Sequence, residues 1–159
     1  MFTDLAGFSR QVAQFGIIHF LQIILEQKRL LLPIIEQYDG ILIKIEADSL
    51  LVLFKQPQQA LACAIAMQRI CQAASARRAP EEQLILCCGL GFGKLLKIGD
   101  DDVFGHEVNI ASKLGEDVAK GHEILVTRAC REAIGDIASI TWDELRTAED
   151  VCWRVGYPR

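Results

Sequence analysis

The segment 12–38 carries apolar residues at helical spacing. This period predicts a helix that begins at a cap on Ser9 and runs to about Tyr38. Pro33 lies inside the pattern, so a break or a kink is expected just before it. The most hydrophobic stretch, 15–25, is shorter than the ~20 residues needed to cross a bilayer, so no membrane contact is expected within these residues.

The rest of the chain alternates between strand and helix patterns. Asp39-Gly40 predicts a turn, and two strands, 41–46 and 49–54, are expected to form a hairpin around Ala47-Asp48. The later elements are expected as a helix over 57–76, strands over 84–90 and 94–98, a loop at 100–102, a helix over 107–119, a strand over 123–127, a helix over 128–134 and weak strands near 140 and 155. This βαββαβ order with extra C-terminal elements predicts an α+β, ferredoxin-like sandwich with helices on one face of a mostly antiparallel sheet.

The chain is expected to form one domain over residues 1–159, because its length fits a single domain and no repeat or linker divides it. The first strand leads into Asp4, and only three residues precede that position. Three residues are too few for a central position in a sheet. We therefore expect this strand to be truncated, with upstream residues missing.

The composition is that of an ordinary globular domain, with 51% apolar and 24% charged residues. Seventeen basic and 21 acidic residues give a net charge of −4 and a pI of about 5.4. This acidic balance opposes a nucleic-acid-binding domain, for which a pI above roughly 9 is typical. The six cysteines form no C-x-x-C pair and are expected to be free, buried thiols in a cytoplasmic protein.

Two aspartates are the first candidates for chemistry. Asp4 ends the first expected strand and is followed by a glycine-containing turn and a helix, a natural phosphate-binding arrangement. Asp48 lies in the hairpin turn, so neighbouring strands would bring both carboxylates to one sheet edge. Paired aspartates that bridge hard cations suit nucleotide phosphoryl chemistry. By spacing alone, the alternative stays open that Asp4 is a helix-capping acid and Asp48 an ordinary turn residue.

A third segment places Asn109 and Lys113 four residues apart on one helical face, shortly after Asp102. With this segment, the sequence resembles the catalytic domain of class III adenylate and guanylate cyclases. Four blocks carry the resemblance in the family's order, over roughly residues 2 to 127: FTDLAGF, IKIEADSLLVLF, DVFGHEVNIASKL and GHEILVT.

The resemblance implies a metal site and a phosphate site. Asp4 and Asp48 would hold two Mg²⁺ or Mn²⁺ ions, with the carbonyl of Leu5 as a further ligand. The triphosphate would be bound by backbone amides around Gly7, Phe8 and Ser9. The implied reaction is attack of the ribose 3′-oxygen on the α-phosphate of ATP, which yields 3′,5′-cyclic AMP and pyrophosphate.

The resemblance also implies which base is read and how the site is assembled. Lys44 and Asp102 occupy the two purine-reading positions, and this pair selects adenine: Lys donates to N1 and Asp accepts from the exocyclic amine. Asn109 would orient the ribose. In this family the metals come from one chain and these three residues from the other, so a homodimer with two equivalent sites is expected. An upstream sensor or regulatory domain is a possible further partner.

Several positions depart from the family pattern. Lys113 stands where an arginine usually stabilises the pentavalent phosphorus, and it lacks the planar fork of a guanidinium. Cys87 stands at the place of a phosphate-binding arginine, and a C-terminal lysine has no clear counterpart other than Arg146. Ala47 replaces the hairpin glycine, and Glu46 adds negative charge. Weak activity is therefore expected, and the alternative is a catalytically degenerate module that dimerises, binds nucleotide or regulates.

Overall fold

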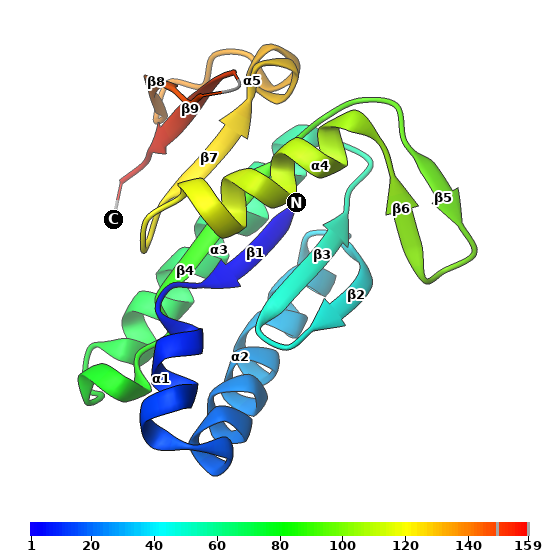
Figure 1. The fold of residues 1–159 in the computed structure, drawn as a ribbon. Coiled ribbons are helices and arrows are strands. Elements are labelled where there is room, and N and C mark those ends of the chain that lie inside the picture. Colours follow the sequence, from blue (N-terminus) through cyan, green and yellow to red (C-terminus); the bar gives the residue numbers. More distant parts are fainter. Residues whose placement is uncertain (149, 159) are drawn as a thin grey trace.

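A computed structural model describes residues 1–148 and 150–158 of the chain. Seven strands form one sheet in the order β2-β3-β1-β4-β7-β9-β8, and β5 and β6 form a separate hairpin that projects from it (Figure 1). Among the described residues, β4 and β7 form the only parallel pair of the large sheet. The strands are β1 Phe2–Leu5, β2 Ile41–Glu46, β3 Ser49–Leu53, β4 Leu86–Leu90, β5 Leu96–Ile98, β6 Asp102–Phe104, β7 Ile124–Thr127, β8 Thr141–Arg146 and β9 Val151–Gly156.

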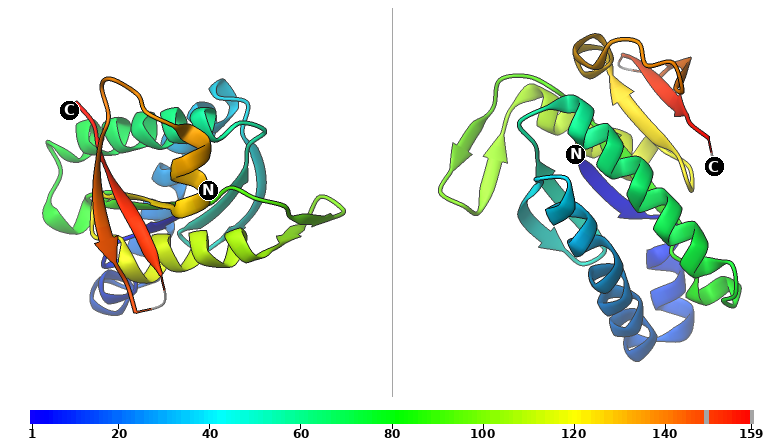
Figure 2. Two further views of the ribbon diagram at one scale, coloured as in Figure 1. Left: turned by 90° about the horizontal axis from the view of Figure 1, so that it is seen from above. Right: turned by 180° about the vertical axis from the view of Figure 1, so that it is seen from behind.

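The helices lie on both faces of the large sheet. Helices α2 and α3 cover one face, and α4 crosses the other, as the view from above in Figure 2 shows. The bounds are α1 Phe8–Phe15, α2 Ile17–Gln37, α3 Pro57–Ser75, α4 His106–Lys113 and α5 Arg128–Ile134, with a 3₁₀ turn at Pro80–Glu82 and a π-helical turn at Leu114–Val118.

The expected α+β fold and mostly antiparallel sheet are confirmed, but the expectation that all helices share one face is wrong for α4. The close approach of α4 depends on Gly89, where an added Cβ would lie 2.0 Å from the carbonyl oxygen of Ala111. Strand β4 is consequently buried along its whole length. A strand covered on both faces shows a continuous apolar run, which matches the sequence of β4.

Strand β1 lies inside the sheet, between β3 and β4, although so few residues were expected to be too short for a central position. Thr3 is registered against Leu50 of β3 on one side and Cys88 of β4 on the other. Leu5 is 4% exposed and belongs to the main core. Pairing on both sides and burial thus fix the position of β1 and of Asp4, which follows Thr3.

The long helix expected from Ser9 is divided in two. Gly16 (φ 86°, ψ 179°) separates α1 from α2, in a conformation that residues with a Cβ avoid. The N-cap of α1 is Gly7 rather than Ser9. Helix α2 continues through Pro33, because Leu31 and Ile35 on either side pack into the core and outweigh the cost of the proline.

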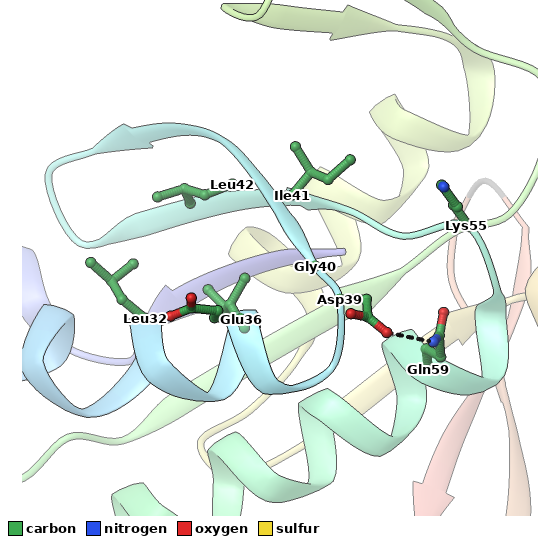
Figure 3. A pocket seen from close by; sticks show the side chains of 9 residues that line it. Leu32, Glu36, Asp39, Gly40, Ile41, Leu42, Lys55 and Gln59 are labelled. Carbon is green, nitrogen blue, oxygen red and sulfur yellow. Dashed lines mark hydrogen bonds between the residues drawn. The ribbon is translucent and has the colours of Figure 1, made fainter.

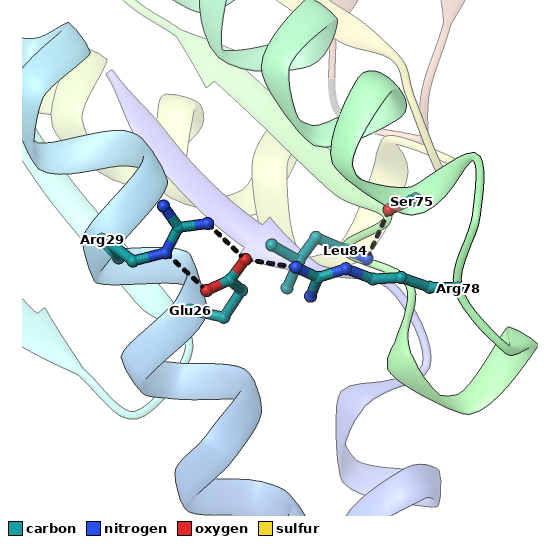
Figure 4. A network of polar contacts seen from close by, with 5 residues as sticks. All are labelled: Glu26, Arg29, Ser75, Arg78 and Leu84. Carbon is teal, nitrogen blue, oxygen red and sulfur yellow. Dashed lines mark hydrogen bonds and ion pairs between the residues drawn. The ribbon is translucent and has the colours of Figure 1, made fainter.

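Polar contacts attach α2 to the loop after α3, away from the metal-binding aspartates that the sequence predicts. The carboxylate of Glu26 receives two hydrogen bonds from Arg29, at 2.7 and 2.8 Å, and also pairs with Arg78 (Figure 4). These partners, Arg29 first, lower the pKa of Glu26 from 4.5 to about 2. The network therefore anchors the middle of α2, whose buried side carries Gln27.

All six cysteines are free and buried, as expected. Burial raises the pKa of the Cys63, Cys71 and Cys130 thiols to about 12, so they are neutral core residues. Within the described residues, we find no helix that is both long and apolar enough to pass through a lipid bilayer.

Candidate functional site

The two predicted metal-binding aspartates lie beside one cavity of about 760 Å³. Asp4 lies in β1, and its Oδ1 accepts a hydrogen bond from the Ser49 hydroxyl at 2.9 Å. Asp48 lies in the β2–β3 turn, and its Oδ2 accepts from the backbone N–H of Leu5 at 3.1 Å. Because β1 and β3 are neighbours in the sheet, the two carboxylates meet at one edge, as the sequence predicted.

A side chain of α2 forms a hydrogen bond with the turn that carries Asp48. Gln27 is fully buried, and its Nε2 donates to the carbonyl oxygen of Asp48 at 2.6 Å. Ala47 has a φ of 52°, a left-handed conformation that costs a residue with a Cβ roughly 1–2 kcal/mol. The turn therefore keeps the shape that a glycine would adopt freely, and the contact with Gln27 helps to hold it.

The position of Asp48 disfavours its charged form. The residue is 8% exposed. Burial first, and then the nearby carboxylate of Asp4, raise the pKa of Asp48 from 3.8 to about 7, against the opposing hydrogen bond from Leu5. A cation placed between the two carboxylates would relieve this repulsion.

The donor set fits a hard divalent cation. Carboxylate oxygens are the ligands that Mg²⁺ prefers, and Mg²⁺ usually takes only one or two of them, completing its shell with water and substrate phosphate. Among the described residues, no group of three or more His, Cys, Asp and Glu side chains is arranged to hold a metal. Asp4 and Asp48 thus suit a site completed by backbone, water and nucleotide oxygens. The contribution of the Leu5 carbonyl stays a prediction.

The predicted phosphate-binding residues border the same cavity. Gly7 (φ 75°) turns the chain from β1 into α1, and Phe8 and Ser9 form the first turn of the helix. The N–H of Gln11 donates to the Gly7 carbonyl at 3.0 Å, so the preceding amides lack partners within the helix. Such amides favour an anion, because the positive end of the helix dipole adds to them.

The two predicted base-reading residues, Lys44 and Asp102, contact each other between β2 and β6. Lys44 of β2 contacts Glu46 at 3.1 Å and Asp102 at 3.3 Å, and these carboxylates, Glu46 first, raise its pKa. The N–H of Val103 and the ammonium of Lys44 lower the pKa of Asp102. Asp102 was expected in a loop but begins β6, because the hairpin pairs Ile98 with it.

Asn109 and Lys113 both lie on the exposed side of α4. Lys113 borders a second cavity of about 300 Å³, together with Asp117 and with Asp150 before β9. Neither residue borders the cavity of the two aspartates, and nor do Lys44 and Asp102. Within one chain, the residues predicted for the site therefore do not gather around a single cavity. Helix α4 ends at Lys113, six residues earlier than expected, where the chain widens into the π-helical turn.

Three supporting residues were missed by the sequence reasoning. Gln27 and Ser49 form hydrogen bonds with the predicted metal-binding residues Asp48 and Asp4. Glu107 fixes the start of α4, because its Oε2 accepts from the Phe92 N–H at 3.1 Å and from the Thr127 hydroxyl at 2.5 Å. The available signal was helical spacing: Gln27 lies in a polar run, but four residues from both Ile23 and Leu31, and so falls on the apolar face of the expected helix.

Another hollow, of about 590 Å³, lies at the far end of β2 from the Asp48 turn (Figure 3). Its polar side chains include Glu36, Lys55 and Asp39, which accepts from Gln59 at 3.3 Å. No residue predicted for the site borders it.

The model of the adenylate and guanylate cyclase catalytic domain family matches residues 1–144. A Rhizobium meliloti (strain 1021) protein provisionally named adenylate cyclase 3 is 30% identical over 113 residues, which cover 70% of this chain and 19% of that protein. The chain therefore spans about a fifth of this relative's length.

Solved cyclase domains share the fold over nearly the whole chain. The adenylyl cyclase CyaB from P. aeruginosa matches with a TM-score of 0.74 and 20% identity, covering 99% of this chain and 92% of that one. The catalytic core of a rhodopsin-guanylyl cyclase with converted specificity, solved in complex with ATPαS, matches with a TM-score of 0.83 and 14% identity, covering 98% and 92%.

The extent of the family match and the shared fold define the class: a nucleotidyl cyclase catalytic domain. This chain belongs to the adenylate and guanylate cyclase catalytic domain family. Both adenylyl and guanylyl cyclases occur among its structural neighbours.

Proposed function

We propose that this domain is an adenylate cyclase of low activity, which converts ATP to 3′,5′-cyclic AMP and pyrophosphate with two Mg²⁺ or Mn²⁺ ions. The observation that carries the proposal is the pair Asp4 and Asp48 beside the first turn of α1 in one cavity. Asp4 and Asp48, with the Leu5 carbonyl, would hold the two ions, which would supply activation of the ribose 3′-oxygen and screening of charge on the α-phosphate. The amides of Gly7, Phe8 and Ser9 would hold the phosphates.

The choice of ATP is supported by the pair Lys44 and Asp102. Their side chains are 3.3 Å apart, so they can address one purine edge together. The ammonium donates to adenine N1, and the carboxylate accepts from the exocyclic amine. Guanine carries an N–H at N1 and an oxygen at C6, so the same pair would oppose its donors and acceptors. Asn109 orients the ribose.

A homodimer is supported by the separation of the predicted site residues within one chain. Within one chain, none of the base-reading residues borders the cavity of Asp4 and Asp48. A second copy can supply them in a symmetric arrangement with two equivalent sites. The projecting β5–β6 hairpin also exposes large apolar side chains, with Leu96 62%, Ile98 56% and Phe104 53% exposed. Such a surface favours association.

The alternative is a cyclase-homology module that dimerises or binds nucleotide without turnover. Two departures favour it: Lys113 lacks a guanidinium fork, and Cys87, at the place of a phosphate-binding arginine, is 3% exposed with a thiol pKa raised to about 11 by burial. A neutral thiol cannot offset phosphate charge. The two functions are separated by Lys113→Arg, which raises turnover markedly if the site is only weakened.

The test measures cyclic product from concentrated protein incubated with Mn·ATP or Mn·GTP, beside an Asp48→Ala control. Analytical ultracentrifugation of the same samples reports the dimer. Cyclic AMP that is formed by the wild type and lost in the control supports the proposal. If confirmed dimers of the wild type and of the Lys113→Arg variant both yield no product, the domain is the non-catalytic module. Cyclic GMP as the main product would refute the base assignment.

A further inference from the structure

The cavity of the metal-binding aspartates has an unbalanced charge. Four carboxylates border it, those of Asp4, Asp48, Glu46 and Glu116. Among the residues that line it, the only basic one is Arg10, the third residue of α1.

Glu46 is already paired with Lys44 at 3.1 Å, so two divalent cations would offset the other three carboxylates and leave most of the negative charge of a triphosphate unmatched. At the place of the expected phosphate-binding arginine, Cys87 is buried and its thiol carries no charge. Cys87 and Arg10 border the same cavity, from β4 and from α1. The positive charge that is missing at Cys87 is therefore supplied to the same cavity by Arg10.

Arg10 is also available for a ligand. The residue is exposed. Among residues 1–148 and 150–158, nothing forms an ion pair or hydrogen bond with its guanidinium. It follows Phe8 and Ser9 in the first turn, where the unpaired backbone amides already favour an anion. A guanidinium can add two parallel hydrogen bonds to phosphate oxygens.

We propose that Arg10 binds the terminal phosphates of the metal-bound nucleoside triphosphate and replaces the cation missing at Cys87. This inference rests on the proposed function, because it takes the cavity to be the nucleotide site. Arg10 is thereby assigned as a substrate-binding residue, specific for the pyrophosphate part of the ligand.

The test compares Arg10→Ala and Arg10→Lys with Arg77→Ala, a matched control that removes an exposed arginine outside the cavity lining. Calorimetry measures binding of Mn²⁺ alone, Mn·pyrophosphate, Mn·AMP and Mn·3′-deoxy-ATP, which lacks the nucleophile and cannot be cyclised. Thermal melting confirms that each variant is folded.

Arg10→Ala is expected to weaken the binding of 3′-deoxy-ATP and of pyrophosphate by about 10-fold, which is the scale of a charge-assisted hydrogen bond at an exposed site. Binding of Mn²⁺ alone and of AMP should stay unchanged, and Arg10→Lys should recover part of the loss. Arg77→Ala should bind every ligand as the wild type does.

The inference is overturned if Arg10→Ala binds the triphosphate as tightly as the wild type, while the proposed function stands. It is also overturned if Arg10→Ala weakens the binding of AMP as much as that of the triphosphate. The same holds if Arg77→Ala reproduces the loss of affinity, because the effect is then one of net charge. A wild type that binds Mn²⁺ but no triphosphate overturns the inference and the proposed function together.

Discussion

The substitution Asp48→Asn is expected to stabilise the metal-free domain above pH 7. It removes a buried charge that faces Asp4, while the amide oxygen can still accept the hydrogen bond from Leu5. A carboxyl pKa raised from 3.8 to about 7 corresponds to at most about 4 kcal/mol. Relaxation of the site and entry of water reduce such penalties, so roughly 1–3 kcal/mol is expected.

The pH dependence has a definite sign. Because folding raises the pKa of Asp48, the folded chain keeps this proton between about pH 4 and 7, whereas the unfolded chain loses it. This group therefore lowers the stability of the wild type progressively as the pH rises through that window. The difference between wild type and Asp48→Asn should be small at pH 4, grow up to pH 7 and stay constant above it.

Urea unfolding in EDTA from pH 4 to 8 measures this difference directly. At pH 8, added Mn²⁺ should stabilise the wild type and leave Asp48→Asn almost unchanged, since the variant has lost one of the two carboxylates. A variant that is destabilised equally at every pH would refute the reasoning about burial and repulsion. Equal stabilisation of both proteins by Mn²⁺ would show that Asp48 does not bind the metal.

Three further predictions concern the surroundings of the site. Gln27→Ala should cost about 2–4 kcal/mol in urea unfolding, because it leaves a buried carbonyl without its donor and opens a cavity. The double variant Lys44→Glu/Asp102→Ser should shift the ratio of cyclic products from Mn·ATP toward Mn·GTP, because it reverses the hydrogen-bonding pattern offered to the purine. Arg78→Ala should cost about 1 kcal/mol at pH 7 and progressively less between pH 4.5 and 2, where Glu26 becomes protonated, as acid-dependent urea curves would report.

Local chemistry made much of the fold predictable. The hairpin around Ala47-Asp48 has the expected bounds within one residue, and α5 has them unchanged, because strand alternation and turn residues act over short distances. Helix α3 begins at Pro57 as expected, since a proline fits the first helical position. The break at Gly16 was missed, because a single glycine within an apolar period does not reveal its backbone conformation.

The sequence by itself determined the residue types that carry the proposed chemistry: Asp4 and Asp48 for metals, and a Lys44/Asp102 pair for adenine. The order of the two aspartates along the chain and the turns beside them were enough to predict that both carboxylates lie at the same edge of the sheet. In the structure, the two aspartates border one cavity and Lys44 contacts Asp102.

Only the tertiary structure decided what surrounds these groups. The support of the Asp48 turn by Gln27 and the presence of Arg10 in the acidic cavity join residues from α2, the hairpin and α1, far apart in sequence. The position of α4 on the second face depends on Gly89, through a close approach that no local pattern encodes. Long-range packing sets burial and proximity, and these in turn set the charge balance of the cavity and the pKa of Asp48.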